Sequence, residues 1–180
     1  MMFVVAVATI VLLAGCVGPA PTPTPTETAS EPVFASEDEA LAAAEGLFAQ
    51  YVEATDLMSA SGGEDLSGFD GILTPNQLTD ESEQASELQA EGKHMVGSHG
   101  YFDFRLQQLD QSDPPNVFIQ AYVCADLTDV RYVDAQGNDT SAPGHSLSAP
   151  LEAVFINSEE LPSTLLIEDV RRWTGDDFCS

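Results

Sequence analysis

The chain opens with an unbroken apolar stretch and then changes character abruptly. Residues 1–13 carry only apolar or small side chains, and every second residue from Pro19 to Pro25 is proline. The apolar run ends after about 17 residues, near the lower limit of the roughly 20 that cross a bilayer, so a membrane-spanning anchor is only a second interpretation. Alternating prolines remove backbone donors and favour an extended chain, which predicts a linker outside any packed core.

A long helix is predicted directly after this linker. Apolar residues recur at three- and four-residue spacing from Leu41 to Met58, as expected for a helix with one buried face. Ser36 and Glu39 form a capping box at its start. The prediction is a helix over residues 37–59.

A second helix is predicted after a short connection, in which residues 69–73 indicate one helical turn. Thr74 followed by Pro75 begins the helix and Gly92 ends it, since proline suits the first helical position. Few positions in this segment are apolar. The helix is therefore expected to lie on the surface.

Beyond Lys93 the apolar spacing changes to two, which is typical of half-buried strands. Five strands are expected, one around 96–106 and the others over 117–125, 129–133, 151–156 and 165–173. In the first of them, Val96, Phe102, Phe104 and Leu106 share one face, while His99, Tyr101, Asp103 and Arg105 share the other. The apolar face is predicted to meet the core and the polar face to meet solvent. Helices followed by strands favour an α+β domain with a curved antiparallel sheet of about five strands and the helices on one face.

Charge narrows the range of partners. The chain holds 30 Asp and Glu against 5 Lys and Arg, a net charge of −25, and no Lys or Arg precedes Lys93. Binding to phosphate backbones depends on basic side chains that release counterions, so nucleic acid is excluded as a partner. Two interpretations of the acid excess stay open. It is either a solvated coat or a surface for a cationic peptide, protein or metal ion.

The apolar segment ends in Leu13-Ala14-Gly15-Cys16, which resembles the lipobox of bacterial lipoproteins. The resemblance implies a signal peptide over residues 1–15 and a diacylated, palmitate-type anchor on Cys16. Residues 16–35 would then be a Pro/Thr-rich tether that holds a folded domain, residues 36–180, about 50 Å from the extracytoplasmic face of the cell membrane. An ordinary cleaved signal with an incidental cysteine is the alternative.

Lipidation of Cys16 leaves two of the three cysteines, Cys124 and Cys179. Two remaining thiols in an exported protein usually pair. Such a disulfide would add about 4 kcal/mol of stability by closing a long loop. Two unrelated buried thiols are the alternative.

Three segments carry a narrower resemblance, namely Tyr122–Asp126, Asp129–Asp134 and Trp173–Cys179. They are similar to exported actinobacterial lipoproteins of unknown function with a nuclear transport factor 2-like, or SnoaL-like, cone fold. Over roughly residues 37–180, the resemblance implies N-terminal helices packed into the concave face of a strongly bent sheet. It also implies a disulfide between the second strand and the C-terminus.

Candidate chemistry is sparse. Some relatives with the cone fold use Tyr, Asp or His for proton transfer, which makes His99, Tyr101 and Asp103 the candidate catalytic residues. Their predicted place on the solvent face argues against that role. His94 and His99 lie five apart and are expected on opposite faces, and His145 falls in a Gly/Pro/Ser loop. No metal and no cofactor are expected, because no sequence motif for either occurs.

These observations favour a lipid-anchored binding or scaffolding module. A SnoaL-like cavity enzyme, such as an isomerase, dehydratase or hydrolase, is the alternative. Besides the membrane, the partners that stay open are a basic protein or peptide, a small apolar ligand, and a second copy bound through the sheet. An apolar concave face would favour the module, and an inward acid–base pair would favour the enzyme.

Overall fold

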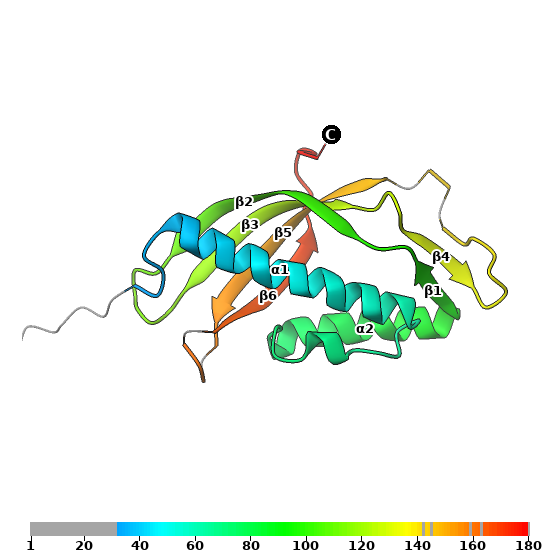
Figure 1. Cartoon of the computed structure of the whole chain (residues 1–180), viewed down its shortest axis with the longest axis horizontal. Coiled ribbons are helices and arrows are strands. Elements are labelled where there is room, and N and C mark those ends of the chain that lie inside the picture. Colours follow the sequence, from blue (N-terminus) through cyan, green and yellow to red (C-terminus); the bar gives the residue numbers. More distant parts are fainter. Residues whose placement is uncertain (1–31, 142, 145, 159, 163, 180) are drawn as a thin grey trace, which may run out of the picture.

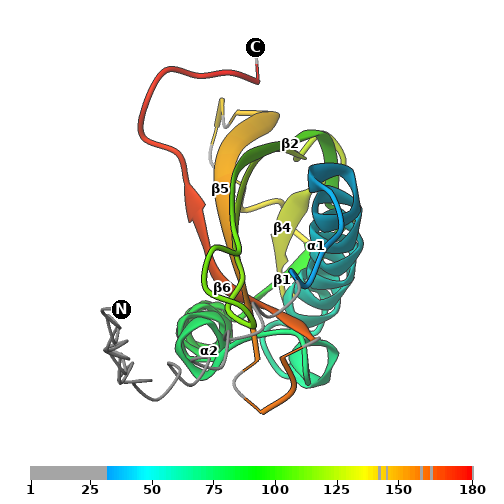
Figure 2. The same cartoon turned by 90° about the vertical axis from the view of Figure 1, so that its left-hand side faces the viewer.

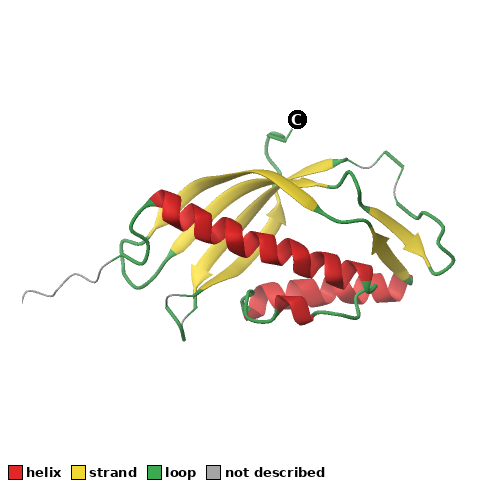
Figure 3. Cartoon of the chain, in the orientation of Figure 1, coloured by secondary structure: helices red, strands yellow, loops and turns green. Residues whose placement is uncertain are grey.

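The computed structural model describes residues 32–141, 143–144, 146–158, 160–162 and 164–179. Helices α1 (Glu37–Ala60) and α2 (Pro75–Glu91) flank a short 3₁₀ helix, η1 (Ser67–Phe69). Six strands follow in these residues: β1 (Lys93–Val96), β2 (Gly100–Asp110), β3 (Phe118–Asp126), β4 (Arg131–Asp134), β5 (Ser148–Asn157) and β6 (Leu165–Arg172). Figures 1 and 3 show α1 running along the strands, and Figure 2 shows α2 at the lower end of the sheet, next to β6. The predicted α+β class is confirmed.

Both helices begin and end close to the predicted residues because their capping signals form. The Ser36 side chain accepts a hydrogen bond from the Glu39 amide at 3.2 Å, and the Thr74 side chain accepts one from the Gln77 amide at 3.4 Å. Helix α2 ends at Gly92, whose φ of 62° lies in the left-handed region that glycine adopts without strain.

The strands form two antiparallel sheets. One has four strands in the order β2-β3-β5-β6, and the other is a two-stranded ribbon of β1 and β4. The single strand expected around 96–106 is therefore two strands, which corrects the predicted number. Strand β1 ends just before Gly97, whose φ is 93°. A Cβ atom at this position would lie 1.8 Å from the carbonyl oxygen of Asp129. Only glycine fits this close approach.

The four-stranded sheet is bent, and α1 lies across its concave face (Figure 2). Large apolar side chains from both layers form one core, among them Phe48 and Met58 from α1, Ile119 and Phe155 from the sheet, and Phe69 from η1. This is the cone arrangement implied by the resemblance to nuclear transport factor 2-like proteins. The ribbon of β1 and β4 extends beyond the sheet at the end where α1 and α2 finish (Figure 1).

Helix α2 packs through a face that is only partly apolar. Gln77, Glu81 and Ala85, spaced four apart, are buried, whereas Leu78 is 38% exposed. The expectation of a surface helix holds only for the opposite side. The inward side is largely polar, and it forms part of the site described next.

Candidate functional site

A cavity of about 260 Å³ lies between α1 and the concave face of the sheet. We call it the α1 cavity. Its apolar lining comes from Phe48, Val52, Leu127, Ala149, Leu151 and Val170, and its polar lining from Tyr51, Thr55, Gln84, His99 and Tyr101. Apolar walls with a few polar groups are typical of small-molecule sites, although this volume is somewhat below the roughly 300–1,000 Å³ of most such sites.

A bulge in β2 brings Tyr101 and His99 to this cavity. Phe102 pairs with Cys124 and Arg105 with Tyr122, so β2 contains one more residue than β3 over this interval. The extra residue is accommodated at Asp103, whose φ of 58° is left-handed, a conformation that Asp tolerates better than most residues. Before the bulge the odd-numbered side chains of β2 face the core, and directly after it the even-numbered side chains do.

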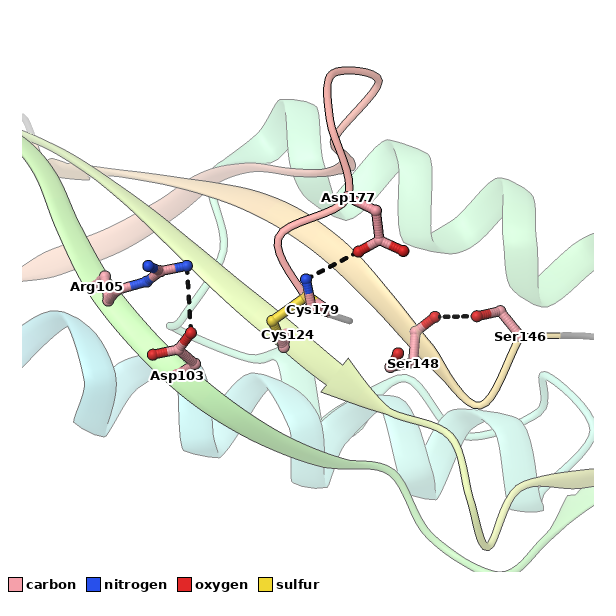
Figure 4. Close-up of a disulfide and its surroundings, with 7 residues drawn as sticks. All are labelled: Asp103, Arg105, Cys124, Ser146, Ser148, Asp177 and Cys179. Carbon is pink, nitrogen blue, oxygen red and sulfur yellow. Dashed lines mark hydrogen bonds and ion pairs between the residues drawn. A yellow bond between two sulfur atoms is a disulfide. The ribbon is translucent and has the colours of Figure 1, made fainter.

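The predicted facing of β2 is corrected accordingly. Tyr101 faces inward and packs edge-on against Phe48, with ring centroids 5.3 Å apart, while Phe102 is exposed. Asp103 and Arg105 face outward as predicted, and they pair with each other at 3.2 Å (Figure 4). Of the candidate catalytic residues, His99 and Tyr101 therefore border the cavity and Asp103 does not.

A buried polar cluster lies behind the cavity on the side of α2, and Tyr51 belongs to both. The Tyr51 hydroxyl donates to Glu81 Oε1 at 2.6 Å, and Gln77 Nε2 donates to the same oxygen at 2.9 Å. Gln77 Oε1 in turn accepts the Val170 amide at 3.3 Å. These bonds join α1, α2 and β6 through one carboxyl group that is 1% exposed.

Burial raises the pKa values of both tyrosines and of the buried glutamate. Burial raises the pKa of Glu81, although hydrogen bonds from Tyr51 and Gln77 offset part of the effect. Burial, followed by the neighbouring Glu81 charge, holds the pKa of Tyr51 well above its ordinary value. Burial and, to a smaller extent, Glu45 also raise the pKa of Tyr101. Both phenols are therefore hydrogen-bond donors and not bases at neutral pH.

His99 is fixed by Asp56 on the last turns of α1. Asp56 Oδ1 accepts the His99 backbone amide at 3.0 Å and lies 2.6 Å from the ring Nδ1. A carboxylate at Nδ1 makes that nitrogen a donor, so the neutral ring carries its lone pair on Nε2. No described residue hydrogen-bonds to Nε2. This His–Asp pair is the one arrangement of described residues at the cavity that could act as a base.

The remaining sequence candidates do not add to this site. His94 lies on β1 and borders a different hollow, with Lys93 and Gly62. Among the described residues, no three His, Cys, Asp or Glu side chains converge on a point that could hold a metal ion. Cys16 and His145 lie outside the described residues. No described helix has both the length and the apolar character to cross a bilayer.

Tyr51, Asp56, Gln77 and Glu81 belong to the site but were not singled out from the sequence. Tyr51 appears in the apolar stripe of the first helix, where it is indistinguishable from a core residue. Gln77 and Glu81 lie on a helix face that looks solvated, since charged residues surround them in sequence. The usable signal was the four-residue spacing of Gln77, Glu81 and Ala85, which puts an alanine on their face.

The convex face of the sheet carries the predicted disulfide. Cys124 on β3 is bonded to Cys179 in the C-terminal tail, 55 residues away, and Asp177 accepts the Cys179 amide (Figure 4). Next to it, the Tyr122 ring stacks on Phe178 with centroids 5.2 Å apart and contacts Trp173 at 4.8 Å. The tail thus covers part of the face opposite α1.

No family model and no curated protein sequence matches the chain. Among solved structures, the chain is similar to the intermembrane space region of the chloroplast protein ARC6, with a TM-score of 0.52 and 12% identity, over 73% of this chain and 95% of that one. At this identity the likeness concerns the fold alone.

Two further structures are more distant. A periplasmic fragment of TraM has a TM-score of 0.48 and 15% identity, over 77% of this chain and 98% of that one. Aln2 from a Streptomyces species has a TM-score of 0.41 and 13% identity, over 76% and 91% of the two chains.

Proposed function

We propose that the chain is an exported, membrane-tethered binding domain whose α1 cavity takes up a small, largely apolar ligand. The observation that carries this proposal is the cavity itself, which lies between α1 and the sheet and is bordered mainly by apolar side chains. The few polar groups that border it fit the role of fixing a ligand's orientation.

The polar groups support binding over chemistry. The pKa values of Tyr51 and Tyr101 are raised, so both keep their protons. Glu81 already accepts hydrogen bonds from Tyr51 and Gln77, and it is too buried to reach a ligand without breaking them. This cluster is suited to holding the wall of the cavity in one shape.

The Cys124–Cys179 disulfide supports export, because such bonds persist in oxidising compartments. The lipobox and the Pro/Thr-rich stretch before the domain support a lipid anchor on Cys16. Replacement of Cys16 by Ser would remove the acylated atom, so we expect the variant to leave the detergent-rich phase in phase partitioning. Unchanged retention in that phase would exclude the lipoprotein proposal and leave the cavity proposal in place.

The cavity proposal predicts that a bound small molecule raises the melting temperature, since a ligand that binds only the folded state stabilises it by RT ln(1 + [L]/Kd). A library of small apolar compounds should yield hits with the wild-type protein. Val52→Phe should abolish the shift by filling the cavity. Leu57→Phe is the matched control, because Leu57 lies on the same helix, is 50% exposed and does not border the cavity.

A ligand shift that survives Val52→Phe, or that Leu57→Phe abolishes equally, would contradict binding in the α1 cavity. A library without a single hit would also contradict it. The fold of both variants is checked by far-UV circular dichroism before the screen.

A cavity enzyme of the isomerase, dehydratase or hydrolase type is the second candidate, because the His99–Asp56 pair borders the same cavity as Tyr101. A histidine whose Nδ1 is held by a carboxylate can act as a general base through Nε2. Turnover of a cavity ligand that His99→Gln abolishes and Asp103→Asn leaves intact would establish this function. Asp103 is the appropriate control, since it faces away from the cavity.

A further inference from the structure

A second cavity adjoins the α1 cavity. Its volume is about 310 Å³, and Val130, Tyr132, Ser141 and Arg172 border it. His99 and Leu127 border both cavities, so the two are neighbours with these side chains between them. We call it the Arg172 cavity. Together the two could hold one elongated ligand, with an apolar end under α1 and a polar end beside Arg172.

Arg172 has no acidic partner among the described residues and borders a cavity. Lys93 pairs with Glu91, Arg105 with Asp103, and Arg171 with Glu152 and Asp169. Arg172 and Arg131 form no ion pair with any described residue. With 30 Asp and Glu in the sequence, a guanidinium group that borders a cavity without a carboxylate is available to an anion from outside, and its fork of N–H donors matches a carboxylate.

The neighbouring groups are also donors. Ser141 Oγ accepts the Tyr132 amide at 3.0 Å, which leaves the serine O–H able to donate. The Tyr132 hydroxyl carries a donor of its own. His99 is held through Nδ1 by Asp56, so Nε2 is the ring nitrogen left for a ligand. The set offers a guanidinium and two hydroxyl groups to one ligand headgroup.

We propose that the ligand of this site is a small amphiphile, with its apolar chain in the α1 cavity and a carboxylate at Arg172. The proposal rests on the proposed function and specifies its ligand class. The net charge of −25 acts against an anion at long range, but at physiological ionic strength that field is screened beyond about 8 Å. Contact with Arg172 lies within this distance, so the local interaction decides the preference.

The test compares three ligands that share an eight-carbon chain: octanoate, 1-octanol and octylammonium. Binding is measured by equilibrium dialysis against the full chain in lipid nanodiscs, with empty nanodiscs as the blank for partition into lipid. If the overall charge governed selection, octylammonium would bind best. The proposal predicts that octanoate binds best, by about fivefold over 1-octanol, a modest factor because Arg172 is exposed.

Arg172→Gln should remove the preference for octanoate and leave binding of 1-octanol unchanged, and Arg172→Lys should retain part of the preference. Arg131→Gln is the matched control, since Arg131 is also exposed and also lacks an ion pair with a described residue, but does not border either cavity. Melting curves show whether each variant is folded.

Equal binding of octanoate and 1-octanol, tighter binding of octylammonium, or an equal loss in Arg131→Gln would overturn the carboxylate assignment while the proposed function stands. If none of the three ligands binds above the blank, the proposed function fails together with the assignment. If a folded Arg172→Gln protein bound neither octanoate nor 1-octanol, the carboxylate assignment would also be overturned. Arg172 would then shape the cavity and not recognise the anion.

Discussion

The two faces of the four-stranded sheet are covered in different ways. On the concave face, α1 and α2 cover the strands through non-covalent contacts and leave a cavity of about 260 Å³. On the convex face, the C-terminal tail is bonded covalently to β3 through Cys124 and Cys179 and packs aromatic rings on Tyr122. The first face leaves a hollow beside the strands, whereas the second is closed by a bond that does not open under oxidising conditions.

Each face also buries one glutamate, and the difference between the two is instructive. Glu152, on the convex side, is 3% exposed and pairs with Arg171, which is itself largely in solvent. Glu81, on the concave side, is 1% exposed and receives hydrogen bonds from the neutral groups of Tyr51 and Gln77. A cation would support the charged form, but neutral donors support it only partly. Burial raises the pKa of Glu81, so this carboxyl group makes the stability of the domain depend on pH.

The largest effect is expected on the convex face, from removal of the disulfide. The double variant Cys124→Ser, Cys179→Ser should lower the free energy of unfolding by about 4 kcal/mol, because the bond closes a long loop in the unfolded chain. Urea denaturation measures the change. Ligand binding by the folded variant should be unaffected, since neither cysteine borders the α1 cavity.

Reduction of the wild-type protein should reproduce the loss of stability. An unchanged urea midpoint would show that the bond does not stabilise the domain. Loss of ligand binding in the folded double variant would contradict the separation of the two faces.

A smaller effect is expected on the concave face, from Glu81→Ala. The substitution leaves the Tyr51 hydroxyl and the Gln77 amide without their acceptor and removes buried contacts, so we expect a loss of about 3 kcal/mol in the free energy of unfolding. Glu81→Gln is the control, because its amide oxygen can accept both hydrogen bonds, and it should lose much less. Equal losses in the two variants would mean that the hydrogen bonds contribute nothing beyond packing.

The same comparison shows what could be predicted from the sequence. The helix ends depend on local signals, Ser36, Thr74 and Gly92, and they formed where expected. The disulfide followed from the number of cysteines. The facing of β2 could not be predicted, since one extra residue at Asp103 reverses the alternation and nothing in the local sequence marks a bulge there.

The buried polar cluster was missed for a different reason. Sequence patterns identify a buried helix face by its apolar residues, and the buried face of α2 is formed by Gln77, Glu81 and Ala85. Burial of these polar groups is possible only because Tyr51 and the Val170 amide complete their hydrogen bonds. Tyr51 lies 30 residues from Glu81 in sequence, and Val170 lies 93 residues from Gln77. Only the folded chain brings these hydrogen-bond partners together, so local sequence patterns do not show them.

The smallest expected effect is a pH dependence of stability that comes from Glu81 on the concave side. Because burial raises the pKa of Glu81 in the folded protein, folding favours its protonated form. The resulting contribution to stability is fully present below the pKa of the unfolded chain and is lost as pH rises through the folded pKa. Wild-type protein should therefore gain stability relative to Glu81→Gln when the pH is lowered from 7 toward 5.

The difference between these two proteins isolates Glu81 from the other acids. Asp110 and Asp126 have lowered pKa values, because Ser112 and Thr128 donate hydrogen bonds to them, so their contributions are lost as pH falls through those low values. They are present in both proteins and cancel in the comparison. Urea denaturation at several pH values gives the measurement. A difference that stays constant from pH 7 to pH 5 would place the pKa of Glu81 at its ordinary value and would contradict the expected effect of its burial.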